Sequence, residues 1–133
     1  MSDGTTGSGR KFERPIKISR TVESPLTVPM TACLVLDTNI PALMEVDLSS
    51  GDRTDISYSG LGTGANFNRP TDLILDSTTS SIYVTDRGAN SILKVDYSTG
   101  DRTVLSGDSV GSGELFQFPA GIALDKANNR LLV

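Results

Sequence analysis

VDLSSGDRT at residues 46–54 is repeated almost letter for letter as VDYSTGDRT at residues 95–103, 49 positions further along the 133-residue chain. The match continues outside these windows at the same shift, because residues 35–44 correspond to residues 84–93. Downstream, Pro70 and the apolar positions after it, up to residue 84, correspond to Pro119 and the apolar positions up to residue 133. Self-similarity at a fixed period of this length indicates a repeat architecture.

A third copy lies near the beginning of the sequence. GRKFERP at 9–15 resembles GANFNRP at 64–70, and GELFQFP at 113–119 keeps the same Gly, Phe and Pro. Each of these segments follows a stretch rich in Gly and Ser. The first two copies are 55 residues apart rather than 49, so the first repeat carries six more residues than the second. The predicted repeats are 2–56, 57–105 and 106–133, of which the third is partial.

The extra residues of the first repeat fall in the Pro-rich stretch between its first and second apolar segments. Proline has no N–H to donate to a strand ladder, so Pro25 and Pro29 disfavour a central strand here. We therefore expect residues within 19–30 to form a longer connection between the first and second strands of this repeat.

Each repeat divides into four short apolar segments. In the second repeat they are TDLIL (71–75), SIYVT (81–85), ILKVDY (92–97) and RTVLS (102–106). These segments are rich in β-branched and aromatic residues, and none reaches the length of a helix. Gly, Asn, Asp and Ser, which accommodate turns, separate them. The sequence thus predicts four short antiparallel strands per repeat.

Four short strands that recur every 40 to 50 residues are typical of a propeller blade. One blade cannot bury both of its faces, so it needs neighbours of the same kind. We predict an all-β protein, a β-propeller fragment whose four-stranded antiparallel blades follow a 49-residue repeat, about two and a half blades forming one partial domain over residues 1–133. A β-sandwich, the competing all-β fold, predicts evenly spaced strands but no such echo.

The second repeat also carries a resemblance to known families. RPTDLILDSTTSSIYVTDRGANSILKVD (69–96) resembles the NHL repeat, and SIYVTDRGANSILKVDYSTGDRTVL (81–105) is similar to the YWTD blade, with Val84 in place of the Trp. The wider group includes the gluconolactonase-like (senescence-marker) propellers. The resemblance implies a six-bladed β-propeller and favours a periplasmic or extracellular location. It implies no single activity, because these families share blades and differ in function.

Composition excludes several kinds of protein. The chain has no histidine, which removes Ser-His-Asp catalysis and imidazole metal ligands. Its 12 basic and 16 acidic residues are interspersed, and no basic stripe indicates nucleic-acid binding. No apolar run approaches the ~20 residues of a membrane span. A closed six-bladed ring would need roughly 300 residues at this period, so we expect missing blades or self-association to complete the fold.

Aspartates recur at equivalent positions of the repeats, as Asp37 and Asp86 do at the end of the second predicted strand. A carboxylate at a strand end can accept backbone N–H bonds and fix the turn, which is the interpretation we favour. The alternative is a ring of oxygen ligands for calcium around a central channel. The gluconolactonase-like families hold a divalent metal there with Glu, Asn and Asp, but their Glu-Gly-Pro opening strand has no match here. We predict no metal ligand and no cofactor in this chain, and calcium only in a complete propeller.

Loops alternate between the two faces of a four-strand meander. The Gly/Ser-rich linkers 57–69 and 106–118 therefore share one face, the long-loop face, with the loops 37–42 and 86–91. Binding residues lie preferentially on loops held by a rigid scaffold. No residue is predicted to be catalytic, and the ligand-face candidates are Arg14, Asp37, Asn39, Asn66, Asn68, Arg69, Asp86, Arg87 and Asn90.

These observations lead to three hypotheses for function. The first is a non-enzymatic, NHL-like binding scaffold that presents its long-loop face to a protein or glycan partner. The second is part of a metal-dependent, gluconolactonase-like hydrolase whose catalytic residues lie on other blades. The third is a purely structural extracellular repeat. We expect the first, and we expect no nucleic acid as partner.

Overall fold

The computed structural model describes residues 7–20 and 32–133. Within these ranges the chain is all-β, and its helical structure is one three-residue 3-10 turn, η1 (Lys126–Asn128). The strands are β1 (Pro15–Arg20), β2 (Ala32–Asp37), β3 (Ala42–Asp47), β4 (Arg53–Tyr58), β5 (Pro70–Asp76), β6 (Ser81–Asp86), β7 (Ser91–Asp96), β8 (Arg102–Ser106), β9 (Ala123–Asp125) and β10 (Arg130–Leu132).

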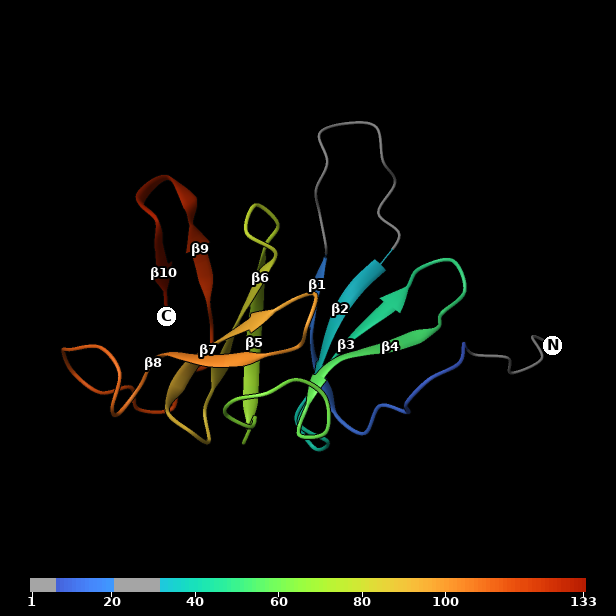
Figure 1. Cartoon of the computed structure of the whole chain (residues 1–133), viewed down its shortest axis with the longest axis horizontal. Coiled ribbons are helices and arrows are strands. Elements are labelled where there is room, and N and C mark those ends of the chain that lie inside the picture. Colours follow the sequence, from blue (N-terminus) through green and yellow to red (C-terminus); the bar gives the residue numbers. More distant parts are fainter. Residues whose placement is uncertain (1–6, 21–31) are drawn as a thin grey trace.

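The strands form two four-stranded sheets and one strand pair (Figure 1). The first sheet has the order β1-β2-β3-β4, the second sheet has the order β5-β6-β7-β8, and β9 pairs with β10 in the third sheet. All pairs are antiparallel and join strands that are neighbours in the sequence. The four strands predicted for the second repeat agree with β5–β8 to within one residue at each end.

The two four-stranded sheets repeat each other down to their irregularities. Each has one bulge at the start of its first strand and another in its fourth strand, which has one residue more than the stretch of the third strand opposite it. The first bulges lie between Pro15 and Lys17 and between Pro70 and Asp72, and the second are at Ile56 and Leu105. Bulges are specific structural features rather than random irregularities. The echo seen in the sequence is therefore a repeat of backbone structure as well as of residue types.

The core lies between the first and second sheets, where β5 contacts both β1 and β2. All six residues of β2 are buried, as expected for a nearly all-apolar strand covered on both faces. The buried core residues are Leu34, Leu36, Leu43, Ile56, Phe67, Leu73, Ile82, Val84, Leu93 and Val95.

The turns alternate between two ends of the sheets. Figure 1 shows the β5–β6 and β9–β10 turns at one end, and the β2–β3 and β6–β7 turns with the linker between the first two sheets at the other. The connection predicted within 19–30 falls almost wholly on residues outside the described ranges, since residues 19 and 20 belong to β1 and the description resumes at residue 32. No helix long and apolar enough to cross a membrane occurs in the part of the chain that the structure describes.

Candidate functional site

The long-loop face is organised by a buried carboxylate at the end of β6. Asp86 accepts hydrogen bonds from the backbone N–H groups of Asn68 (2.6 Å) and Arg69 (2.9 Å) in the preceding linker. It also accepts them from Gly88 (3.0 Å) and Ala89 (3.1 Å) in the turn that follows. One side chain thus ties together two loops that are about twenty residues apart in the sequence.

Asp37 does the same at the end of β2. It accepts from the N–H groups of Glu13 (2.6 Å) and Arg14 (3.1 Å) on one side and from Asn39 (3.0 Å) and Ile40 (3.2 Å) on the other. Asp37 and Asp86 are both 0% exposed. The turn-fixing interpretation of these aspartates is therefore confirmed, and their oxygens are occupied by backbone donors rather than presented to a ligand.

The other predicted site residues divide into two groups. The side chains that reach solvent are those of Arg14, Asn39, Asn66, Asn68, Arg69 and Arg87. Asn90 is half-buried, with its backbone in the left-handed region at φ 46°. Its side-chain oxygen accepts a hydrogen bond from the N–H of Phe118 (3.0 Å), so Asn90 joins the β6–β7 turn to the next linker.

Two arginines and an aromatic ring lie together on this face. The N–H of Arg87 donates to the carbonyl of Arg69 (3.0 Å), and the Arg87 guanidinium lies over the ring of Phe118, 5.1 Å from its centroid. Phe118 is 63% exposed. No carboxylate among the described residues forms a salt bridge with Arg69 or Arg87. The Arg69–Arg87–Phe118 cluster therefore consists of two exposed arginines joined by a backbone hydrogen bond and an exposed ring that the Arg87 guanidinium contacts, on a backbone held by Asp86.

Asn66 has a different role from its neighbours. Its side-chain oxygen accepts from a guanidinium nitrogen of Arg102 (3.4 Å) at the beginning of β8. Arg102 is buried, only 4% exposed, and the sequence analysis did not identify it as a functional or structural residue. The repetition of Gly-Asp-Arg-Thr at 51–54 and 100–103 could have indicated it.

The Arg102 guanidinium is satisfied by oxygen atoms of the linker that precedes its sheet. It donates to the carbonyls of Ala65 (2.7 Å), Leu61 (2.8 Å) and Tyr58 (2.9 Å), and to the hydroxyl of Ser57 (2.5 Å). Burial lowers the pKa of Arg102, and the charge of the neighbouring Asp101 opposes that shift. The guanidinium also lies 5.6 Å from the centroid of the Phe67 ring. This arginine joins the first sheet, the linker and the second sheet.

The turn aspartates have ordinary structural partners. Asp47, the last residue of β3, accepts from the backbone and hydroxyl groups of Ser49 and Ser50, and these bonds lower its pKa to about 2. Asp96 accepts from the N–H and hydroxyl of Ser98 and from the N–H of Thr99, and its pKa is also lowered, chiefly by the Ser98 hydroxyl. These bonds account for the recurrence of aspartate at this position.

A cleft of about 340 Å³, lined by both polar and apolar side chains, separates the outer parts of the two sheets. Glu45 and Asp55 line it together with Tyr97, whose hydroxyl donates a short hydrogen bond to the carboxylate of Glu45. Asp55 forms a salt bridge with Arg10 (2.9 Å). Nowhere in residues 7–20 and 32–133 do three or more Cys, Asp or Glu side chains gather in a way that could hold a metal ion.

No protein-family model matches the chain, and the curated proteins contain no match to it. Function must therefore be argued from the geometry of the long-loop face.

Proposed function

We propose that this chain is part of an NHL-like β-propeller that serves as a non-enzymatic binding scaffold for a protein or glycan partner. Two observations support the propeller assignment. Successive four-stranded meanders repeat each other bulge for bulge, and the first strand of the second sheet lies against β1 and β2 of the first. Blades arranged side by side around a channel pack in this way.

The long-loop face is the binding surface that the geometry supports best. The observation that carries the proposal is the Arg69–Arg87–Phe118 cluster, whose two arginines have no carboxylate partner in the part of the chain that the structure describes. Guanidinium groups bind oxyanions such as carboxylate and sulfate through paired hydrogen bonds, and an exposed ring adds apolar contact. An acidic peptide or an acidic glycan has the chemistry that fits this cluster.

Rigidity is the second requirement for such a surface. Asp86 fixes the backbone of Arg69 directly and holds Arg87 between two bonded loops. Asp37 fixes Arg14 in the same way in the first sheet. Because these loops are ordered before a ligand arrives, little conformational entropy has to be lost on binding.

The experiment is a comparison of two double variants on an array of acidic peptides and sulfated or sialylated glycans. Arg69→Ala/Arg87→Ala should remove binding to the arrayed ligand that the full chain retains. Lys94→Ala/Lys126→Ala removes the same charge from another part of the surface and should leave that binding within about threefold. If no arrayed ligand binds, or if the two variants weaken binding equally, the long-loop face is not the binding surface.

A further inference from the structure

The cleft between the outer parts of the first and second sheets has the size of a small-ligand site. Its volume is about 340 Å³, and ligand pockets in proteins measure about 300–1,000 Å³. It lies between strands β3 and β4 on one side and the β7–β8 turn on the other. The residues that line it all belong to the two four-stranded sheets and the linker that joins them, and they are Glu45, Thr54, Asp55, Ile56, Leu61, Tyr97, Ser98 and Thr99.

Two of these side chains differ in kind from their counterparts in the other sheet. At the 49-residue shift, Glu45 corresponds to Lys94, and Tyr97 corresponds to Leu48. A side chain required to build the sheet is the same in both copies, as the buried aspartates at the ends of β2 and β6 are. The contact between Glu45 and Tyr97 is therefore a property of this cleft and not of the repeat.

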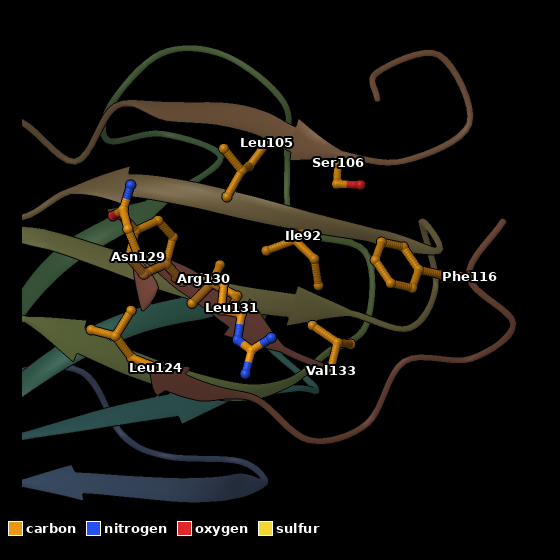
Figure 2. A pocket seen from close by; sticks show the side chains of 10 residues that line it. Ile92, Leu105, Ser106, Phe116, Leu124, Asn129, Arg130, Leu131 and Val133 are labelled. Carbon is orange, nitrogen blue, oxygen red and sulfur yellow. The ribbon is translucent and has the colours of Figure 1, made fainter. Parts of the chain in front are cut away.

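The space on the other side of the second sheet has a different lining. Figure 2 shows a groove of about 390 Å³ there, with Leu105, Leu124 and Leu131 around it. The only charged side chain in the lining of this groove is that of Arg130. A carboxylate is thus not a general feature of the spaces beside the sheets, and the chemistry of the cleft has to be explained by its own residues.

Glu45 brings an unpaired negative charge to the cleft. Asp55 also lines the cleft, but its carboxylate forms a salt bridge with Arg10 (2.9 Å). No Lys or Arg in the part of the chain that the structure describes forms a salt bridge with Glu45. Burial and, after it, the charge of Glu45 raise the pKa of the nearby Cys33 thiol. A cation that enters the cleft therefore meets a charge that no described side chain neutralises.

Two oxygen atoms in the cleft are available as acceptors. The Tyr97 hydroxyl donates to Oε2 of Glu45, and Oε1 accepts no hydrogen bond from a described residue. Thr54 is paired with Glu45 across β3 and β4, so the two side chains are neighbours on the same face of the sheet. The Thr54 hydroxyl has no hydrogen-bond partner within residues 7–20 and 32–133. Carboxylate and hydroxyl together form a place for a group with several donors.

The single available carboxylate oxygen favours one kind of organic cation over another. A guanidinium binds a carboxylate best through two parallel hydrogen bonds, one to each oxygen. Tyr97 occupies one oxygen of Glu45, so this paired arrangement is disfavoured. An ammonium group is a compact charge with three donors and does not depend on a fork of acceptors. The cleft therefore suits an ammonium better than a guanidinium.

The apolar residues of the cleft suit an alkyl stem. Ile56 is 9% exposed and Leu61 is 37% exposed, and both line the cleft together with Glu45. An alkyl stem covers apolar surface while its charged end reaches a polar group. We propose that the cleft binds the ammonium group of a primary alkylamine, with the nitrogen bound to Glu45 and Thr54 and the stem on the apolar side chains. The amine is a lysine side chain of a partner protein or a free alkylamine.

The probe is n-butylamine, which has the alkyl stem of lysine and is protonated at pH 7. Added to the isotope-labelled full chain, it should cause a saturable change in the backbone amide signals of Thr54, Ile56 and Tyr97 at millimolar concentration. n-Butanol, which has the same stem without the charge, should bind at least about tenfold more weakly. n-Butylguanidine should bind at least about threefold more weakly than the amine. A blocked lysine amide that binds as tightly as butylamine indicates a protein side chain as the ligand, and weaker binding indicates a free amine.

Variants of the cleft test the role of each group. Glu45→Lys, which copies the residue of the second sheet, should abolish butylamine binding, and Glu45→Gln should weaken it at least about tenfold. Thr54→Val should weaken it about fivefold through loss of one acceptor. Tyr97→Phe releases the second oxygen of Glu45, so the preference for butylamine over butylguanidine should become smaller. A purely structural role of Tyr97 would not change that preference.

Two controls separate the cleft from the rest of the surface. Asp108→Asn removes an acidic residue outside the cleft and should leave amine binding within about twofold. Arg69→Ala/Arg87→Ala should do the same, because neither arginine lines the cleft, so failure of this inference and failure of the proposed binding face can be told apart. Equal binding of butylamine and butanol, or undiminished binding by Glu45→Gln, would overturn the proposal. So would the absence of a saturable change at tens of millimolar amine.

Discussion

Replacing Asp86 by Ala should destabilise the chain more than any other substitution at a repeated aspartate of the second sheet. Asp86 is fully buried and accepts four backbone N–H bonds. A hydrogen bond to a charged acceptor contributes about 1.5–3 kcal/mol. The four donors belong to exposed residues and can bind water once the carboxylate is gone, so the loss should be about 3–5 kcal/mol rather than the sum.

A loss of this size is large for a domain whose total stability is about 5–15 kcal/mol. With an unfolding entropy near 2.1 cal/mol/K per residue, about 280 cal/mol/K for this chain, a loss of about 4 kcal/mol lowers Tm by roughly 14 °C. Thermal and urea unfolding followed by circular dichroism would measure it. Hydrogen exchange would locate it, since protection should be lost first at the amides of Asn68, Arg69 and Gly88.

The matched control is Asp96→Ala, which removes an exposed carboxylate from a turn of the same sheet. Its effect on Tm should be clearly smaller. Asp86→Asn should lie between the two, because one oxygen remains to accept bonds and the amide nitrogen meets the N–H of Asn68. If Asp86→Ala and Asp96→Ala shift Tm equally, the carboxylate of Asp86 does not hold the two loops together.

Three further outcomes follow from contacts elsewhere. Gly64→Ala should cost at least about 2 kcal/mol more in urea unfolding than Gly113→Ala, because only the first places a Cβ against a backbone oxygen and both share the cost of positive φ. The pKa of Asp47 is lowered to about 2. The stability that its carboxylate contributes to the folded chain is therefore fully present above the unfolded pKa and is lost as pH falls through about 2. The difference in Tm between the chain and Asp47→Asn should close between pH 5 and pH 2. A double-mutant cycle of Tyr97→Phe and Glu45→Gln should give a coupling of about 1 kcal/mol, and an additive cycle would show that their bond does not join the two sheets.

The secondary structure was predictable because the repeat presents every element twice. The turns were placed by Gly-Asp and Asn residues that adopt positive φ or bind their own backbone, as Gly100 and Asn90 do. The roles of Asp37 and Asp86 were also predictable, since a carboxylate that recurs at a strand end has one simple use. Register bulges such as that between Pro70 and Asp72 could not be read from the sequence, because they depend on how the neighbouring strand is aligned.

The site was less predictable than the fold. Nine polar loop residues were placed on one face, but the sequence could not separate exposed Arg69 and Arg87 from buried Asp86, because burial is decided by which backbone groups approach. Asn66 belongs with Arg102 rather than with the arginine cluster. The Arg102 contacts span 37 to 45 residues of sequence, and most of them end on carbonyl oxygens, which carry no residue signature.

The residues that repeat most strictly are in the nine-residue segments 46–54 and 95–103. They connect each four-stranded sheet to the linker that precedes it, which explains why they are so similar. Core positions differ between similar apolar side chains, as Leu43 and Ile92 do, because volume-conserving swaps cost little. No other side chain replaces the guanidinium fork of Arg102, and only glycine adopts positive φ freely.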